Sequence, residues 1–372
     1  SINMGKALEE IAQELRNSDK KVQLIYAFNG VGKTRLSRTF KELIASKQGD
    51  STGEEEIAVK VIYYNAFTED LFYWDNDLDE DVNRKLKIRP NGFTRWVLED
   101  EGQANNIISL FQHYTSNKLT PRFNETYSEI SFSIDGGNEE RTENIKISRG
   151  EESSLIWCVF YSLLKEVVEV LSTSEAENRS THQFDNLKYV FIDDPVSSLD
   201  ENHLIELAVN VAELIKLSPK ELKFVITTHN PLFYNVIYNE LNSKVGYMLD
   251  KNEDGTFELK EKKGDSNKSF SYHLFLKQTI EEAIEVDNIQ KYHFTLLRNL
   301  YEKTANFLGY PRWSDLLPDD KQTYYNRIIQ FTSHSTLSNE AVAEPTAAEK
   351  QTVKFLLDHL IENRYWKKEE QQ

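Results

Sequence analysis

The stretch Ala27-Phe-Asn-Gly-Val-Gly-Lys-Thr34 decides the fold. It ends an apolar run that begins at Val22, and it precedes a segment with helical spacing, residues 35–45. A glycine-rich turn between a strand and a helix is the context in which backbone N–H groups surround phosphates. Lys33 would then reach the β- and γ-phosphates, and the Thr34 hydroxyl would hold Mg²⁺. The usual first glycine is replaced by Ala27. The predicted nucleotide-binding residues of this turn are Asn29, Gly30, Gly32, Lys33 and Thr34.

A second apolar run, residues 189–192, ends in two acids, Asp193 and Asp194. Such acids complete a phosphate-binding site, because the first can bind Mg²⁺ and the second can polarise the attacking water. Another apolar strand follows later in the chain and ends at His229. The sequence therefore predicts Asp193 as a metal ligand and Asp194 as the base in nucleotide hydrolysis.

The segment Ile147-Ser-Arg-Gly-Glu151 opens a long helix. It places a serine hydroxyl and a free helix N-terminus where they could face a γ-phosphate, so Ser148, Gly150 and Glu151 are further candidates for nucleotide binding.

The order of these motifs resembles the ABC-type ATPase heads of the Rad50, SMC and RecF kind. The resemblance implies that residues 148–151 are a signature loop, that residues 197–200 are a D-loop and that His229 is the switch histidine. It also implies a homodimer or a higher even oligomer in which two heads sandwich the nucleotide. Two features depart from the family: Asp194 stands where Glu is usual, and only residues 65–68 offer a candidate Q-loop.

Strands alternate with helices up to about residue 250, which favours an α/β core with a largely parallel sheet. The stretch 70–81 is expected to be a surface excursion, and residues 130–134 and 144–147 are expected to be strands. After Gly264 the pattern becomes helical, at about 272–286, 291–308, 321–331 and 347–362. We therefore expect an ABC-type P-loop NTPase domain at 1–261 and a smaller, mainly α-helical domain at 262–372.

Composition excludes several classes of protein. The 372 residues carry 44 Lys and Arg against 61 Asp and Glu, a net charge of −17, which excludes a coat protein for nucleic acid. No run of about 18 apolar residues is present, which excludes a membrane-spanning protein, and no secretory signal is visible. The single cysteine, Cys158, lies in an apolar stretch, so we expect an inert core residue in a cytoplasmic protein.

The helical region contains a second candidate site. Arg298 and Glu302 are spaced i,i+4 beside an apolar stripe, a pattern that alone favours a surface salt bridge. Arg327 begins a helix that leads to His334. An Arg, a Glu and a His suffice for RNA cleavage without a metal, because they can activate the 2′-hydroxyl, protonate the leaving oxygen and stabilise the charged phosphorane. The spacing of Arg327 and His334 also fits the loose pattern of the HEPN ribonucleases.

Nearly the whole chain resembles the PrrC family of bacterial anticodon nucleases. The resembling stretches are residues 26–30, 63–76, 264–273 and 331–338. The resemblance implies an NTPase that gates a nuclease cutting tRNA-Lys 5′ of the wobble nucleotide, with Arg298, Glu302 and His334 as catalytic residues and no metal there. It implies Mg²⁺ with GTP or ATP, and a response to dTTP, at the NTPase site. It also implies a phage-response effector silenced by a type I restriction–modification complex.

The family's anticodon-recognition segment falls on residues 263–272, with Asp265, Ser266 and Asn267 as the candidates for recognition of tRNA. A carboxylate can accept hydrogen bonds from exocyclic amines of a base, although Asp265 is equally well a turn residue after Gly264. Seven aromatic residues of the helical region could stack on bases, and the sequence singles out none of them. They are Tyr272, Tyr292, Tyr301, Tyr310, Trp313, Tyr324 and Tyr325.

Two other functions remain open from the sequence: an ABC-type ATPase for DNA ends or recombination with a non-catalytic helical module, and a non-enzymatic nucleotide sensor. The acidity belongs to residues 1–261, which hold 29 basic and 45 acidic residues, whereas residues 262–372 hold 15 and 16. A nearly neutral lobe excludes avid, sequence-blind binding to phosphate backbones and still allows a selective tRNA enzyme.

Overall fold

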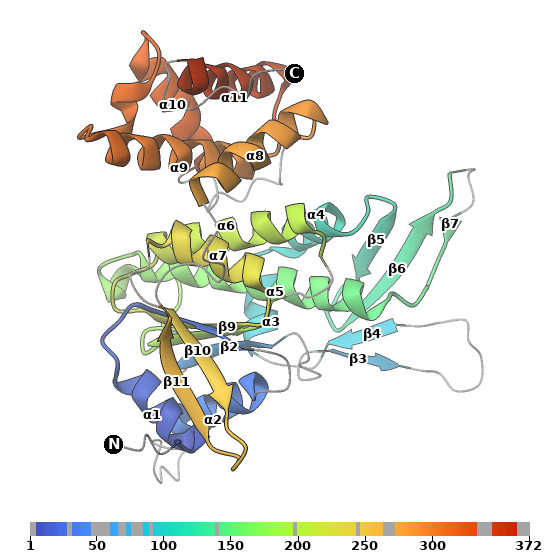
Figure 1. Cartoon of the computed structure of the whole chain (residues 1–372). Helices are drawn as coiled ribbons and strands as arrows, with labels where there is room; N and C mark the ends of the chain where they lie inside the picture. Colours follow the sequence, from blue (N-terminus) through green and yellow to red (C-terminus); the bar gives the residue numbers. More distant parts are fainter. Residues whose placement is uncertain are drawn as a thin grey trace.

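The computed structural model shows a sheet with helices on both faces, a smaller antiparallel sheet to one side, and a separate helical lobe (Figure 1). It describes residues 5–27, 32–45, 60–65, 72–75, 85–88, 92–137, 141–195, 199–242, 246–262, 272–332 and 344–362.

The main sheet has the strand order β11-β10-β1-β9-β8-β2. The five strands from β10 to β2 are parallel, and β11 is antiparallel to β10. The parallel core confirms the predicted fold class, whereas β11 lies in a charged stretch for which no strand is predicted. Acidic and basic side chains suit a strand at the sheet edge, because they discourage pairing with another chain. The strands are β1 (Val22–Tyr26), β2 (Val61–Asn65), β8 (Tyr189–Asp193), β9 (Lys223–Thr228), β10 (Gly246–Lys251) and β11 (Phe257–Lys262).

Two layers of helices cover this sheet (Figure 1). One face carries α1 (Leu8–Asn17) and α2 (Lys33–Ala45), which bury a compact apolar cluster against β1, β8 and β9. The other face carries α5 (Arg149–Leu171), α6 (Glu201–Leu217) and α7 (Pro231–Glu240). Helix α5 is buried on most of its circumference, as expected of a helix that is apolar nearly all round, and Cys158 lies in that core as predicted.

The second sheet pairs β3 (Phe72–Asp75), β4 (Lys85–Ile88), β6 (Glu129–Asp135) and β5 (Leu119–Phe123) in that order, and β7 (Arg141–Thr142) extends β6. One expectation about this region is wrong, because residues 144–147 form no strand. The stretch 70–81, expected to be a surface excursion, contains β3, an edge strand that was not predicted. Strand β3 was not predicted because its short aromatic sequence is flanked by acidic residues. Helix α3 (Gly92–Arg95), the π-helical turn η1 (Trp96–Asp100) and α4 (Ala104–Tyr114) link β4 to β5, and the 3₁₀ turn η2 (Ala176–Asn178) follows α5.

The helical lobe consists of α8 (Tyr272–Glu285), α9 (Lys291–Leu308), the 3₁₀ turn η3 (Trp313–Leu316), α10 (Lys321–Thr332) and α11 (Ala347–Leu360). These bounds confirm the four predicted helices. The lobe rests on the head through α9 against α6 and α8 against α7, and one continuous apolar cluster joins the two parts. Within the described ranges, no helix is both long enough and apolar enough to cross a membrane.

Candidate nucleotide site and nuclease site

The nucleotide site forms where three neighbouring parallel strands end together. Strand β9 lies between β1 and β8, so the predicted turn after β1, the acids after β8 and the histidine after β9 share one edge of the sheet. Backbone hydrogen bonds fix this convergence: the amide of Ala27 donates to Thr228 O over 3.0 Å, and the amide of Asp194 donates to Thr227 O over 2.7 Å. Topology therefore brings together residues as far apart in the chain as Ala27 and Thr228.

Asp193 is a buried acid whose orientation is set by a neighbouring hydroxyl. Thr227 Oγ1 donates to its Oδ1 over 2.6 Å, which leaves the second carboxylate oxygen to other partners. A buried carboxylate at the sheet edge suits Mg²⁺, which prefers hard oxygen ligands. Thr34 lies in the first turn of α2, on the element that follows the phosphate-binding turn. The buried carboxylate of Asp193 therefore fits a nucleotide-bound Mg²⁺.

Asp194 is the hub of the remaining polar contacts. Its φ of 51° is left-handed, a conformation that Asp tolerates better than most residues, and it turns the carboxylate toward both β1 and β9. Its Oδ2 lies 3.7 Å from Lys33 Nζ and contacts His229 Nδ1, while its Oδ1 accepts from the amide of His229 over 3.3 Å. Lys33, Asp194 and His229 are thus brought together as predicted, and their roles in hydrolysis remain predictions.

Gly32 immediately precedes α2 with φ of 114°, a conformation that favours glycine. A Cβ at this position would lie 3.1 Å from the ring of Phe257, so Phe257 of β11 packs closely on Gly32 and would have to shift slightly to admit a side chain. Asn29 and Gly30 lie outside the described residues, as do residues 66–68 of the candidate Q-loop. Asn65, the first residue of that candidate, pairs with Asp193 in the sheet register.

The predicted signature loop opens α5 through a capping box. Glu151 N donates to Ser148 Oγ over 3.2 Å, and Ser148 N donates to Glu151 Oε1 over 2.9 Å. Two of the unpaired N–H groups at the start of the helix are satisfied in this way. Ser148 is exposed and Gly150 is half-buried, so the loop lies at the surface, as a loop that contacts the nucleotide of a second subunit requires. Its role as a signature loop stays a prediction.

The predicted nuclease residues Arg298 and Glu302 lie side by side on α9. Arg298 Nε is 3.5 Å from Glu302 Oε1, and the two side chains are 11% and 40% exposed. The arginine of this ion pair is largely buried at the junction and the glutamate reaches the solvent. The side chains therefore have less conformational freedom than those of the surface pair that the spacing alone favours. His334, Asp265, Ser266 and Asn267 lie outside the described residues, and their roles remain predictions.

Arg298 is also held by the head domain. Its Nη2 donates to Glu213 Oε1 over 3.0 Å, and the Glu213 side chain, on α6, is only 8% exposed. Lys216 Nζ lies 3.3 Å from the same oxygen. Arg298 Nε is buried and makes no hydrogen bond within the described ranges, so one edge of the guanidinium is fixed and the edge toward Glu302 is not fully satisfied.

A second buried acid, Glu240 at the end of α7, strengthens this junction. It accepts hydrogen bonds from Tyr272 of α8 and Asn299 of α9. Burial raises the pKa of Glu240 above its ordinary value, and the nearby Lys216 and the hydroxyl of Tyr272 oppose that rise. Buried polar networks of this kind specify geometry, because an unpaired member would be costly. The two domains are therefore locked together beside the predicted catalytic arginine.

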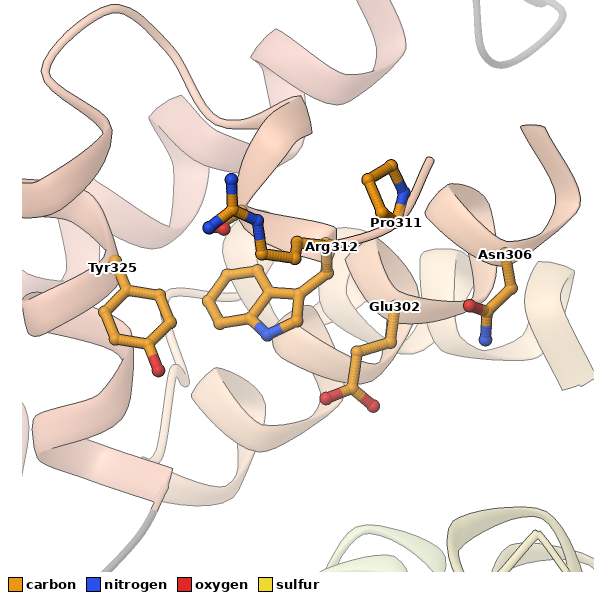
Figure 2. Close-up of a pocket in the computed structure, with 7 residues that line it drawn as sticks. Glu302, Asn306, Pro311, Arg312 and Tyr325 are labelled. Carbon is orange, nitrogen blue, oxygen red and sulfur yellow. The ribbon is translucent and has the colours of Figure 1, made fainter. Parts of the chain in front are cut away.

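An open pocket of about 350 Å³ adjoins Glu302 (Figure 2). It lies where α9, η3 and α10 meet, and its wall combines aromatic, amide and guanidinium groups. Figure 2 shows Arg312 between Tyr325 and Glu302, with Pro311 above Glu302 and Asn306 beyond it on the side away from Tyr325. The lining residues are Glu302, Asn306, Pro311, Arg312, Trp313, Ser314 and Tyr325.

Sequence reasoning missed Thr227, Glu213 and Glu240. A polar pair at the end of an apolar strand, Thr227 and Thr228, is a usable signal for residues that support the nucleotide site. Glu213 has a weaker signal: it lies seven residues after Glu206, and both are acids within the largely apolar stretch 204–215 of α6. Glu240 gives no signal, because its partners come from distant parts of the chain.

The strand order, the acids after β8 and the glycine turn before α2 define an ABC-type P-loop ATPase fold that is followed by a helical lobe. The family described as "AAA domain" matches residues 95–354, which span most of the head and of the lobe. The protein named "Anticodon nuclease" from Escherichia coli is 63% identical over 393 residues, with 99% of each chain covered. The chain therefore belongs to the AAA domain family and to the anticodon nuclease family, and is an endoribonuclease that carries an NTPase domain.

Solved SMC heads are similar to this chain at a low level. The structure titled "SmcHead bound to the C-winged helix domain of ScpA" is 13% identical, with 66% of this chain and 91% of that chain covered and a TM-score of 0.32. A Pyrococcus furiosus Smc head domain bound to the C-terminal domain of ScpA is 14% identical, with 50% and 38% covered and a TM-score of 0.28. TM-scores this low support no inference about function.

Proposed function

We propose that the chain is a nucleotide-gated endoribonuclease that cuts the anticodon loop of tRNA-Lys on the 5′ side of the wobble nucleotide. One observation carries the proposal. In the helical lobe, the largely buried Arg298 and the half-exposed Glu302 form an ion pair, and Glu302 lines an open pocket. The relative named "Anticodon nuclease" supports the choice of RNA as substrate. The choice of tRNA-Lys and of the wobble position rests on the sequence resemblance.

The proposed chemistry needs no metal at the nuclease site. A base takes the proton of the ribose 2′-hydroxyl, the 2′-oxygen forms a bond to phosphorus, and the bond from phosphorus to the 5′-oxygen breaks as an acid protonates that oxygen. The products are a 2′,3′-cyclic phosphate and a 5′-hydroxyl end. Glu302 and His334 supply the base and the acid, and Arg298 stabilises the extra charge of the phosphorane.

The gate in this proposal is α6. The helix starts beside the predicted D-loop, where Asp200 Oδ1 caps it by accepting from the amide of His203 over 2.9 Å. Its 17 residues, Glu201–Leu217, form a rigid rod of about 25 Å, and Glu213 lies in the second-to-last turn of that rod. A change of head geometry on nucleotide binding would move this rod and weaken the hold of Glu213 on Arg298. The guanidinium would then become available to the scissile phosphate.

The remaining parts of the proposal concern ligands and partners. Mg²⁺ with GTP or ATP, or with dTTP, binds the head through residues 29–34 and Asp193, and two heads pair as a homodimer or a higher even oligomer. Residues 265–267 contact the anticodon. A type I restriction–modification complex keeps the enzyme silent until phage infection. These statements extend the sequence resemblance, and the nucleotide part agrees with the donors present at the sheet edge.

The deciding experiment incubates the full chain with total tRNA and each nucleotide in turn, and then maps the cut ends. A single cut in tRNA-Lys with a 5′-hydroxyl end, lost in His334→Ala and in Glu302→Gln, is the expected result. Intact tRNA with every nucleotide tried would overturn the nuclease proposal. Equal cutting with and without nucleotide would overturn the gate and leave the nuclease standing.

A further inference from the structure

The pocket beside Glu302 has the size and the lining of a small-ligand site. Its volume of about 350 Å³ lies in the range of roughly 300–1,000 Å³ that is usual for such sites. Three separate elements build it: α9, the turn that leads into η3, and α10. Because α9 is anchored on the head and α10 packs on α9, the walls are held by tertiary contacts rather than by one loop.

Aromatic rings form one wall of the pocket and are fixed in place. The rings of Trp313 and Tyr325 stack with 5.2 Å between centroids and 23° between planes. Tyr301 meets the Trp313 ring edge-on at 6.3 Å and 72°, and it is itself anchored by donating its hydroxyl to Leu356 O over 2.6 Å. Trp313 and Tyr325 are only partly buried, so ring surface remains available on the pocket side. Such a wall suits a flat, unstacked ring.

The rim carries groups that suit the rest of a nucleotide. The Arg312 side chain is 78% exposed, and its ion pair with Asp315 is loose at 3.8 Å, so the guanidinium can turn toward a phosphate at little cost. Asn306 contributes an exposed amide that can donate to and accept from a base edge or a 2′-hydroxyl. Glu302 completes the rim, so a ligand in the pocket lies next to the predicted catalytic carboxylate.

We propose that this pocket is a nucleotide subsite, in which one unstacked nucleotide of single-stranded RNA stacks on Trp313 while Arg312 binds its phosphate. The inference rests on the proposed ribonuclease function and names the residues that would hold the substrate beside Glu302. Single-stranded RNA is recognised mainly by stacking of splayed bases on aromatic side chains, and an anticodon loop offers such bases. A duplex keeps its bases stacked inside and cannot enter a pocket of this size.

The direct test observes Trp313 in the full chain. The protein, which has five tryptophans, is labelled with 5-fluorotryptophan, and the Trp313 ¹⁹F resonance is identified by its loss in Trp313→Phe. The probe is an anticodon stem-loop of tRNA-Lys with a 2′-deoxy sugar at the cleavage position, which cannot be cut. The Trp313 resonance is expected to shift with this stem-loop and to stay unchanged with an RNA duplex. An unchanged resonance at saturating stem-loop would overturn the inference.

Variants provide a second test that does not depend on the label. Trp313→Leu should weaken binding of the stem-loop about tenfold, as expected for the loss of one stacked base, and Trp313→Phe should restore most of it. Arg312→Gln should weaken binding about fivefold, as expected for an exposed charged contact. Arg95→Gln is the matched control, because Arg95 is 75% exposed and pairs with Glu99 within its own helical segment. Equal effects of Arg312→Gln and Arg95→Gln would overturn the assignment of the phosphate contact.

The two proposals can fail separately. If the wild-type chain cuts the cleavable stem-loop, and Trp313→Leu and Arg312→Gln cut it with the same KM, the subsite is refuted and the ribonuclease proposal stands. Wild-type chain that cuts no RNA, yet binds the stem-loop in a way that depends on Trp313, would refute the ribonuclease and leave the nucleotide subsite in place.

Discussion

Replacing Glu213 by glutamine tests the contact that joins the two domains at the predicted catalytic arginine. The substitution keeps the shape of the side chain and an oxygen acceptor, and it removes one negative charge. Arg298 then loses the charge of its partner at 3.0 Å and keeps its contact with Glu302 at 3.5 Å, and Lys216 loses the charge of its partner at 3.3 Å. The change therefore leaves two cations near a neutral amide, of which Arg298 is 11% exposed and Lys216 is 35% exposed.

The magnitude follows from this geometry. Removing one partner of a fully buried ion pair costs about 3–5 kcal/mol, and a hydrogen bond to a charged group contributes about 1.5–3 kcal/mol. Glu302 and the retained amide oxygen reduce the loss, so we expect a destabilisation of about 2 kcal/mol. For a chain of 372 residues that unfolds as one unit, at about 2.1 cal/mol/K of unfolding entropy per residue, this corresponds to a fall in Tm of about 2–3 °C.

Calorimetry of Glu213→Gln, Arg298→Gln and the double variant measures the pairwise coupling. The double variant is expected to lose about 1–2 kcal/mol less than the sum of the single variants, because the contact can be lost only once. Glu282→Gln, at an exposed site on α8, is the control and should change stability by less than about 0.5 kcal/mol. Additive single effects would refute the coupling. Cleavage of tRNA by Glu213→Gln without nucleotide is the matching functional result, and unchanged dependence on nucleotide would refute the gate.

Three further predictions concern the nucleotide site and the response of the lobe to acid. Lys33→Ala should raise the Kd for nucleotide about tenfold to a hundredfold in a binding titration, since it removes a charged hydrogen-bond donor; unaltered affinity would place the phosphates elsewhere. Asp194→Asn, which tolerates the left-handed backbone, should slow NTP hydrolysis about 10²–10⁴-fold while nucleotide still binds, and normal turnover would exclude Asp194 as the base. His293 is buried in the first turn of α9, and burial lowers its pKa to about 4. Its Nδ1 accepts from the amide of Gln290 over 2.8 Å, a hydrogen bond that requires this nitrogen to carry no proton. The folded state therefore favours the neutral ring, and the stability that this ring contributes is present above about pH 6.5 and is lost as the pH falls toward 4, by about 2 kcal/mol at pH 5. Urea unfolding at pH 8 and pH 5 should show a smaller acid loss in His293→Gln, and an equal loss in both proteins would assign the acid sensitivity to other groups.

Much of the fold could be predicted, because local patterns determine it. The run 189–192 is apolar and ends in acids, which predicts a buried strand and its end, and both are confirmed in β8. The four lobe helices follow from 3.6-residue periodicity, and their bounds agree with the structure to within about two residues. The exceptions include the expected strand at 144–147, which is absent, and several strands that were not predicted, among them β3, β4, β5 and β11. Strands β3 and β11 are short or charged, and their stability comes from their pairing partners rather than from their own composition.

Site residues could be predicted where they belong to a short sequence motif, and could not be predicted where only tertiary contacts bring them to the site. Lys33, Asp193, Asp194 and His229 lie in recognisable motifs, and the sheet order then brings them together. Arg298 and Glu302 could be named from their helical spacing and the family resemblance. The residue that holds Arg298 could not be named, because Glu213 is 85 positions away and approaches it only through the packing of α6 on α9.

The sequence alone specified the chemistry of this protein: a phosphate-binding turn, acids at strand ends and an Arg–Glu pair on a helix, since each depends on residue types at short spacing. The tertiary structure decided which of these groups are coupled. Docking of the lobe on α6 and α7 buries Arg298 against an acid of the head, and packing of η3 and α10 on α9 turns two of seven candidate aromatic residues into a pocket wall beside Glu302. Both outcomes require contacts between segments that are distant in the sequence. Those contacts set how deeply each side chain is buried, and burial in turn determines the strength of a charge pair and how much of an aromatic ring a ligand can reach.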